Sequence, residues 1–239
     1  MSKFIDRLKQ LNEGVPQPIG FRPRGAASEK PKIQLVVAVA EAGVAGRIAG
    51  ADAILLDSAS APASKVELPW GIRLSATAPP DGCDFVVFPT ETPLTLGVEE
   101  GVGKVLAVSP SLPSEVVRAL NGMSLDAVLL SAAEGRGQSL TWIELVDFHR
   151  LAAALNKPLL VEVPASITGA EIGQVWKAGA ACIVVRITSG QTKRVAELRE
   201  AIGALTPPVA VRNSRPVVRA PMAASSVRTE DEDEEEEDE

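Results

Sequence analysis

The sequence has few aromatic residues and no long apolar run. Of its 239 residues only 3% are aromatic and none is Tyr, so Val, Leu, Ile and Ala have to build the core. That composition suits a parallel sheet covered by helices better than an antiparallel sandwich. No apolar stretch approaches the roughly 20 residues of a membrane span, and the amphipathic N-terminus lacks the apolar centre of a secretory signal. We therefore expect a cytoplasmic protein with no membrane partner.

Cysteine and histidine are also scarce, which argues against metal and thiol chemistry. Cys83 and Cys182 form no CxxC pair, and each lies at or near the start of an apolar run, so we expect two buried thiols in a reducing compartment. The one histidine, His149, falls inside a helical pattern, where we expect a packing or surface role. Because there is no His/Cys cluster and no Walker loop, the sequence predicts no metal and no cofactor.

Negative charge is concentrated at the C-terminus. The formal net charge is −7, yet residues 230–239 are all Asp or Glu. The rest of the chain carries 24 basic against 21 acidic residues, and so weak an excess gives little reason to expect nucleic-acid binding. We expect residues 206–239 to form a Pro-rich linker and a disordered acidic tail.

Eight apolar runs recur along the chain, most of them continuous rather than alternating. Continuous runs are typical of strands that are buried on both faces. The expected strands cover residues 33–40, 51–57, 70–76, 83–89, 103–109, 125–131, 158–164 and 181–188. Helical patterns follow at 111–122, 139–156, 167–179 and 189–205. This alternation predicts parallel βα units, and eight of them predict an α/β fold of the (β/α)8 TIM-barrel type over residues 33–205.

The expected barrel is short of helices in its first half. No helical pattern follows the second and third strands, and at most one turn follows the fourth. Residues 1–32 are expected to form an N-terminal helix (about 2–12) and a linker, with the helix covering the bottom of the sheet. Ser111 or Ser114 is expected to cap the helix of 111–122, and Gly122 to end it. The alternative fold is an open doubly wound sheet, which the absence of GxGxxG after the first strand disfavours.

Candidate functional residues are the polar side chains at the C-terminal ends of the strands, because those ends line one open face of a barrel. They are Glu41, Asp57, Arg73, Glu91, Ser109, Ser131, Glu134, Glu162, Arg186 and Thr188. Two pairs lie on neighbouring strands: Asp57 with Arg73, and Glu162 with Arg186. Each pair can offset the cost of burying its two charges. The pairs either fix the packing of the core or form a site, and the sequence leaves both readings open.

Arg186 is the candidate cation for a carboxylate or phosphate ligand. An adjacent guanidinium stabilises the ionised form of Glu162, which therefore suits holding Arg186 better than moving protons. The loop after the last strand adds Thr188, Ser189, Gly190 and Lys193, where free helix amides and hydroxyls can bind an anion. The preceding loop, 164–171, offers Ser166, Thr168 and Gly169 in the same way. Ordinary Ser/Thr capping of the two helices is the alternative.

Two stretches, AGADAILLD (49–57) and PLLVEVP…KAGAACIVVRIT (158–188), resemble the phosphate-binding barrels of tryptophan biosynthesis. Within that ribulose-phosphate-binding (β/α)8 superfamily they are most similar to indole-3-glycerol-phosphate synthase. The resemblance implies a barrel fold. It places Glu162 where the family has a functional glutamate, and Arg186 where the family typically has an asparagine. The strand-borne lysines of that family have no counterpart here, so the resemblance does not extend to synthase activity.

Two functions follow as expectations. In the first, the chain is a small-molecule barrel that binds an anionic metabolite, either phosphorylated or not, through Arg186, Arg73 and the 188–193 loop. A lyase or isomerase step would then use Asp57, Glu41 or Glu162 as acid or base. In the second, it is a barrel without catalysis that binds a protein. The helix-poor half would leave apolar strand surface for a second subunit or a protein partner to cover, and the acidic tail would engage a basic partner.

Overall fold

The chain folds into a closed barrel of eight parallel strands, in the order β1-β2-β3-β4-β5-β6-β7-β8. This computed structural model describes residues 2–13, 33–57, 61–62, 66–74, 78–94, 101–131 and 139–206. Residues Met1–Pro208 form one compact unit. The expected linker and acidic tail lie outside the described residues from position 207 onward. In the described part of the chain, no helix is long and apolar enough to cross a membrane.

All eight expected strands are present, each somewhat shorter than its apolar run. They are β1 (Gln34–Val39), β2 (Ala53–Leu56), β3 (Trp70–Arg73), β4 (Phe85–Pro89), β5 (Gly103–Val108), β6 (Ala127–Leu130), β7 (Leu159–Val163) and β8 (Cys182–Ile187). β8 pairs in parallel with β1 and closes the barrel, with Ala38 opposite Arg186. The (β/α)8 prediction is therefore confirmed, and the open doubly wound sheet is excluded.

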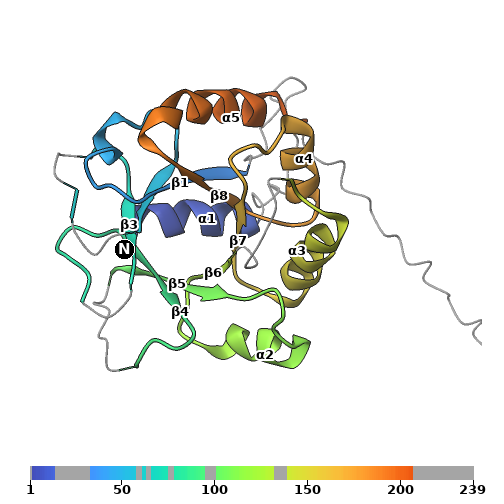
Figure 1. The fold of residues 1–239 in the computed structure, drawn as a ribbon. Helices are drawn as coiled ribbons and strands as arrows, with labels where there is room; N and C mark the ends of the chain where they lie inside the picture. The colour runs from blue at the N-terminus through green and yellow to red at the C-terminus, as the bar shows by residue number, and fades with distance from the viewer. Residues whose placement is uncertain are drawn as a thin grey trace, which may run out of the picture. The chain divides into compact units, whose positions relative to one another are not determined.

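The helices surround only part of the barrel (Figure 1). They are α1 (Lys3–Glu13), α2 (Ser114–Ala119), α3 (Trp142–Ala154), α4 (Gly169–Lys177) and α5 (Thr192–Ala204), with short 3-10 turns η1 (Ala45–Arg47), η2 (Leu120–Gly122) and η3 (Ser189–Gln191). Within the described residues no helix lies between β2 and β5, as the sequence predicts.

The expected serine cap of α2 is wrong. Pro113 occupies the N-cap position, where it makes no side-chain cap hydrogen bond, and Ser114 is the first helical residue. Proline fits here because its extended backbone leads directly into a helix. The end of this helical segment at Gly122 is confirmed.

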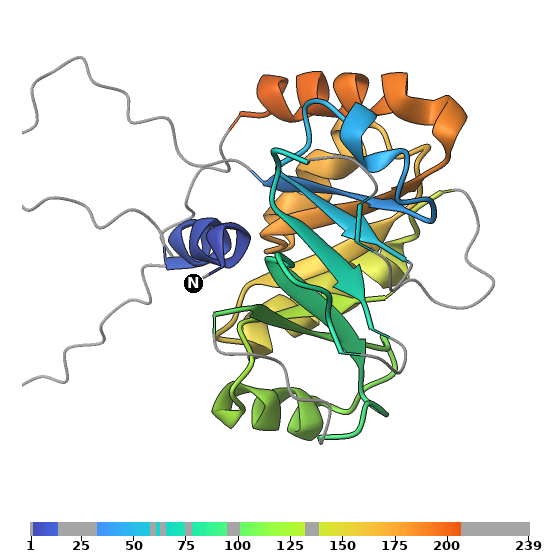
Figure 2. The ribbon, with the colours of Figure 1, turned by 90° about the vertical axis from the view of Figure 1, so that its left-hand side faces the viewer.

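The inside of the barrel is filled by small and medium-sized apolar side chains, and α1 closes its lower end. Phe4, Ile5 and Leu8 of α1 are at most 2% exposed and belong to the same cluster as the inward-facing strand residues. Phe4 packs against Phe85 of β4, with ring centroids 4.6 Å apart. Figure 2 shows α1 lying across this end of the barrel. The expectation that the leading helix covers the bottom of the sheet is confirmed.

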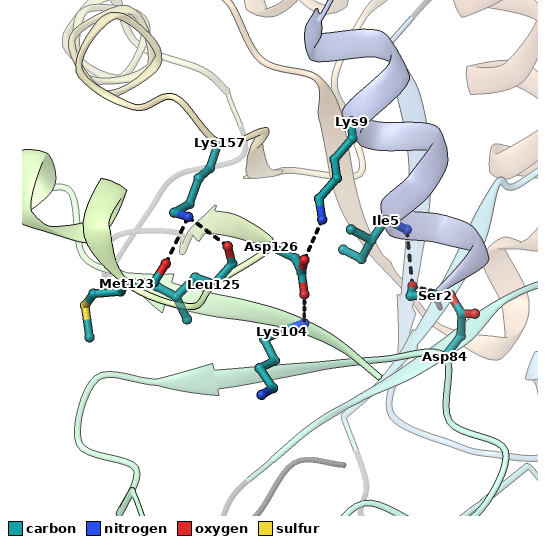
Figure 3. A network of polar contacts seen from close by, with 9 residues as sticks. All are labelled: Ser2, Ile5, Lys9, Asp84, Lys104, Met123, Leu125, Asp126 and Lys157. Atoms are coloured by element: carbon teal, nitrogen blue, oxygen red, sulfur yellow. Dashed lines mark hydrogen bonds and ion pairs between the residues drawn. The ribbon is translucent and has the colours of Figure 1, made fainter. Parts of the chain in front are cut away.

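Two aspartates at the starts of strands hold α1 in place (Figure 3). Asp84, just before β4, accepts hydrogen bonds from Ser2 Oγ (2.8 Å) and from the backbone N–H groups of Lys3 (2.8 Å) and Phe4 (3.0 Å). It thereby satisfies amides that a helix leaves free at its N-terminus. Asp126, just before β6, accepts from Lys9 Nζ at 2.6 Å and from the backbone N–H of β5 at 3.0 Å. Both contacts tie the helix to the N-terminal ends of the strands.

The Lys9–Asp126 pair predicts a measurable pH dependence of stability. Burial opposes ionisation of Asp126, but the hydrogen bonds from Lys9 and from the backbone N–H of Lys104, together with the charges of the two lysines, outweigh it, so the pKa of Asp126 is lowered. A carboxyl whose pKa is lower in the folded state stabilises the fold at any pH above its pKa in the unfolded chain. That stabilisation is lost as the pH falls through the pKa of the folded state. Because both side chains are partly exposed, we expect Asp126→Asn to cost about 1 kcal/mol at neutral pH.

Urea unfolding of both proteins at neutral and acidic pH measures this difference, which should shrink as the pH falls. Lys9→Met in the Asp126→Asn background serves as the control, and it should add little. A deficit that stays constant down to about pH 3 would show that the carboxylate charge is not what stabilises the contact.

Candidate functional site

Four charged side chains meet inside the barrel at the C-terminal ends of its strands. Successive residues of a strand point to opposite faces, and the alternate residues Ala53 and Leu55 of β2 belong to the interior cluster. Asp57 continues that inward series. The same alternation directs Arg73, Glu162 and Arg186 inward from β3, β7 and β8. We call these four residues the mouth quartet: Asp57, Arg73, Glu162 and Arg186.

Arg73 connects two sides of the barrel. Its Nε donates to Asp57 Oδ1 at 3.0 Å, which confirms the contact expected between the second and third strands. Its Nη2 donates to Glu162 Oε1. Because β3 and β7 stand four strands apart in a ring of eight, this second hydrogen bond spans the mouth. One guanidinium therefore holds two carboxylates, and the inner three members of the quartet form a continuous polar layer above the apolar interior.

Arg186 contacts a different carboxylate from the one the strand order predicts. Its Nη2 lies 3.3 Å from Asp57 Oδ2, whereas the sequence suggests Glu162 as its partner. The contact is an ion pair without hydrogen-bond geometry, since Asp57 Oδ2 is buried and accepts no hydrogen bond among the described residues. The side chain of Arg186 is 63% exposed, whereas that of Asp57 is 14% exposed. Arg186 is thus the solvent-facing member of the quartet.

Arg73 keeps its positive charge inside the mouth of the barrel. Burial opposes the charge on Arg73, but Glu162 and then Asp57 outweigh that cost, so the pKa of Arg73 is raised above its ordinary value. A guanidinium held in this way is a permanent cation. The quartet carries two positive and two negative groups, so any net attraction for an anion has to come from the exposed Arg186 and from residues around it.

The other expected ligand-binding residues lie at the same end of the barrel. Thr188, Ser189, Gly190 and Lys193 are all exposed, in the turn after β8 and the first turn of α5. A Cβ added at Gly190 would meet no atom within 4 Å, so space is open beside this turn. Gln191 caps this turn: its side chain accepts from the Thr188 N–H at 3.2 Å, and its own N–H donates to the Thr188 carbonyl at 2.9 Å.

At the start of α4 the capping alternative is confirmed. The carboxylate of Glu171 accepts from the N–H of Thr168 at 2.7 Å and from its hydroxyl at 2.8 Å. These hydrogen bonds, from the backbone and then the side chain of Thr168, lower the pKa of Glu171. An ionised carboxylate at this helix end repels an anion, so the loop before α4 is the poorer of the two candidate phosphate sites.

The remaining strand-end residues are not drawn into the quartet by any contact that the structure describes. Glu41 is exposed in the turn after β1, the strand that pairs with β8. The hydroxyl of Thr90 donates to Glu91 at 2.8 Å, and the hydroxyls of Ser109 and Ser111 lie 2.9 Å apart. Ser131 is half-buried after β6, and Glu134 lies outside the described residues.

Both cysteines are buried, as expected. Burial raises the pKa of Cys83 to about 11 and raises that of Cys182 well above its ordinary value. Nucleophilic cysteines need a lowered pKa, so neither thiol is suited to catalysis at neutral pH. His149 is exposed on α3, in line with the surface role expected for it.

Comparison with known proteins identifies the fold alone. No protein-family model matches the chain, and no curated protein matches it. Among solved structures, one mutant form of the tryptophan synthase alpha-subunit from Pyrococcus furiosus has a TM-score of 0.52 and 16% identity, over 72% of this chain and 94% of that one. A second mutant form has a TM-score of 0.52 and 15% identity, over 73% and 98%. These similarities confirm the barrel fold implied by the resemblance to the barrels of tryptophan biosynthesis.

Proposed function

We propose that the mouth of the barrel binds an anionic small molecule and that Arg186 is the cation that holds it. The observation that carries this proposal is the contrast in exposure within the mouth quartet. The Arg186 side chain is 63% exposed, while those of Arg73 and Glu162 are 25% and 17% exposed. A guanidinium has five N–H donors, and the ion pair to Asp57 occupies one of its two terminal nitrogens. The other donors can bind a carboxylate or phosphate in a bidentate manner.

A phosphorylated metabolite is the ligand class that the surroundings of Arg186 favour. The exposed turn from Thr188 to Gly190 adds hydroxyl and amide donors at the start of a helical segment, and Lys193 adds a second cation. Several N–H donors and two exposed cations at the end of β8 and the start of α5 suit an anion with several oxygens better than a single carboxylate. The half-buried quartet supports the site because it holds Asp57, and through it Arg186, in a fixed position.

Turnover of the ligand would be a lyase or isomerase step, with Glu41, Asp57 or Glu162 as acid or base. Asp57 and Glu162 both accept a hydrogen bond from Arg73, which favours a positioning role for them. Glu41 is the exposed carboxylate of the three, and it is the one best able to exchange a proton with a ligand. The proposal that the mouth binds an anion does not depend on this step.

A thermal-shift series with inorganic phosphate, phosphorylated sugars and carboxylates tests the site. A ligand at about 100 times its Kd should add about 2.7 kcal/mol of stability, which is roughly 5–10 °C in Tm for a domain of this size. We expect Arg186→Ala to weaken binding at least about tenfold, because a hydrogen bond to a charged group is worth about 1.5–3 kcal/mol.

The matched control for this variant is Arg118→Ala, which removes an exposed arginine from α2, away from the mouth. It should leave the ligand-induced shift unchanged. Arg186→Lys, which keeps the charge but not the fork, should bind with intermediate affinity. If a ligand raises the Tm of the wild type and of Arg186→Ala equally, Arg186 does not bind that ligand.

A second candidate function, that of a barrel that binds a protein, is supported by a separate observation. The outer face of β4 and β5 carries an apolar cavity of about 540 Å³, in the part of the barrel where the described residues include no covering helix. Exposed apolar surface of this kind is typical of interaction sites. This candidate concerns the side of the barrel and is compatible with anion binding at the mouth.

A further inference from the structure

The exposed large apolar side chains of the described residues gather in one sector of the barrel. They are Leu94 (98% exposed), Val116 (42%), Met123 (49%), Trp142 (82%), Ile143 (66%) and Val146 (57%). All lie between the end of β4 and the middle of α3. Scattered apolar residues on a surface need no explanation, but a group confined to one side marks an interaction surface.

The first feature of this sector is the open groove on β4 and β5. Phe88 and Leu106 form its floor, and Leu120 and Met123 form the wall on the side of α2. Among the described lining residues only Lys104 is charged, and Figure 3 shows its side chain directed away from α1. In a complete barrel a helix would cover this junction between strands, so the groove has the position and the chemistry of an unfilled helix site.

The second feature is an apolar ridge on the solvent side of α3. The helix buries Phe148 and Leu151 against the barrel, while Trp142, Ile143 and Val146 point outward. The spacing i, i+1, i+4 places the three side chains on one face of the helix. A Trp side chain can bury on the order of 200 Å², and Trp is one of the residue types enriched among the energetic centres of protein interfaces. The chain thus displays both an apolar ridge and an apolar groove.

We propose that a second copy of this chain covers the sector, with the α3 ridge of each copy seated in the β4–β5 groove of the other. The helix α2 lies between the two features, since it packs beside α3 and leads into η2, whose Leu120 lines the groove. A two-fold axis that passes near α2 would therefore place the ridge of each copy against the groove of the other. Most homodimers have a two-fold, self-complementary interface of this kind. The ridge supplies the helix that this half of the barrel lacks. The centre of the interface is apolar, as stable interfaces require.

Sedimentation velocity of the full chain across a wide concentration range tests the proposal. We expect a concentration-dependent species of twice the 25.0 kDa chain mass. Trp142→Glu on the ridge and Met123→Glu on the groove wall should each raise the dimer dissociation constant at least about tenfold. Both positions are exposed, so the variants should fold, and their Tm values and their anion-induced shifts should match those of the monomeric wild type. Ala196→Glu, which adds the same charge on the exposed face of α5, should have no effect.

Disulfide trapping tests the pairing of ridge with groove directly. The native cysteines are at most 8% exposed, so introduced cysteines are the ones that react. Mixing Val146→Cys with Met123→Cys should give a cross-linked dimer under mild oxidation, and mixing Val146→Cys with Ala196→Cys should not. A monomer at every concentration overturns the proposal. A dimer that withstands both glutamate variants overturns this choice of surface.

Discussion

Replacing Arg73 with Met should lower the free energy of unfolding by about 3 kcal/mol at neutral pH, the cost of removing one partner from a buried ion pair. Arg73 donates to Asp57 and to Glu162, whose side chains are 14% and 17% exposed. Without the guanidinium, both carboxylates lose the donor that they share, while Arg186 still contacts Asp57. Met fills a similar volume, so the loss reports charge rather than a cavity. Urea unfolding of both proteins measures it.

Two further variants separate this charge effect from general damage. Arg150→Met removes an arginine of comparable burial that donates mainly to the carbonyl oxygens of Pro110 and Leu112, and it should cost only about 1 kcal/mol. Adding Asp57→Asn and Glu162→Gln to Arg73→Met should recover most of the loss, because neutral amides no longer repel each other. If Arg73→Met stays within about 0.5 kcal/mol of the wild type, the polar layer does not stabilise the barrel.

Most of the fold could be predicted because each strand is a continuous apolar run with a turn signal at its end. The run from Leu159 to Pro164 contains one carboxylate, Glu162, and in the structure its neighbours are buried while Glu162 faces the mouth. The strand-end rule placed all four members of the quartet at the correct end of the barrel. The rule works because all strands of a (β/α)8 barrel run in the same direction, so the residues that follow each strand in the sequence lie at one end of the barrel.

The pairing within the quartet could be predicted only in part. Asp57 and Arg73 lie on adjacent strands, so chain order was sufficient to predict their contact. The hydrogen bond from Arg73 to Glu162 joins residues 89 positions apart across the barrel, and it depends on how far a long side chain reaches over a closed ring. The role of Asp84 was not predicted either. Only the structure shows why a carboxylate precedes β4: Asp84 accepts hydrogen bonds from the first amides of α1. No local sequence pattern links β4 to that helix.

The largest effect of a single methyl group is expected at Gly71. A Cβ at this position would lie 2.4 Å from the carbonyl oxygen of Phe85 and 2.6 Å from its ring. Because Gly71 and Phe85 are paired in β3 and β4, the backbone cannot move apart without breaking the barrel ladder. Phe85 is 0% exposed and its ring packs at a tilt against that of Phe4, so the ring has no free space to enter. We expect Gly71→Ala to cost about 3 kcal/mol or more in urea unfolding.

Two other glycines provide the comparison that makes this result interpretable. A Cβ at Gly103 would lie 2.4 Å from Ile5 Cγ1, a side-chain atom on α1 rather than strand backbone, so Gly103→Ala should cost less, about 1–2 kcal/mol. A Cβ at Gly203, within α5, would meet no atom within 4 Å, and Gly203→Ala should stabilise the chain by up to about 1 kcal/mol. If Gly71→Ala and Gly103→Ala lower the free energy of unfolding by similar amounts, the backbone of β3 makes room for a methyl group as easily as the Ile5 side chain does. The expected order instead implies that the backbone of β3 and β4 at Gly71 is held more rigidly than the α1 side chain that faces Gly103.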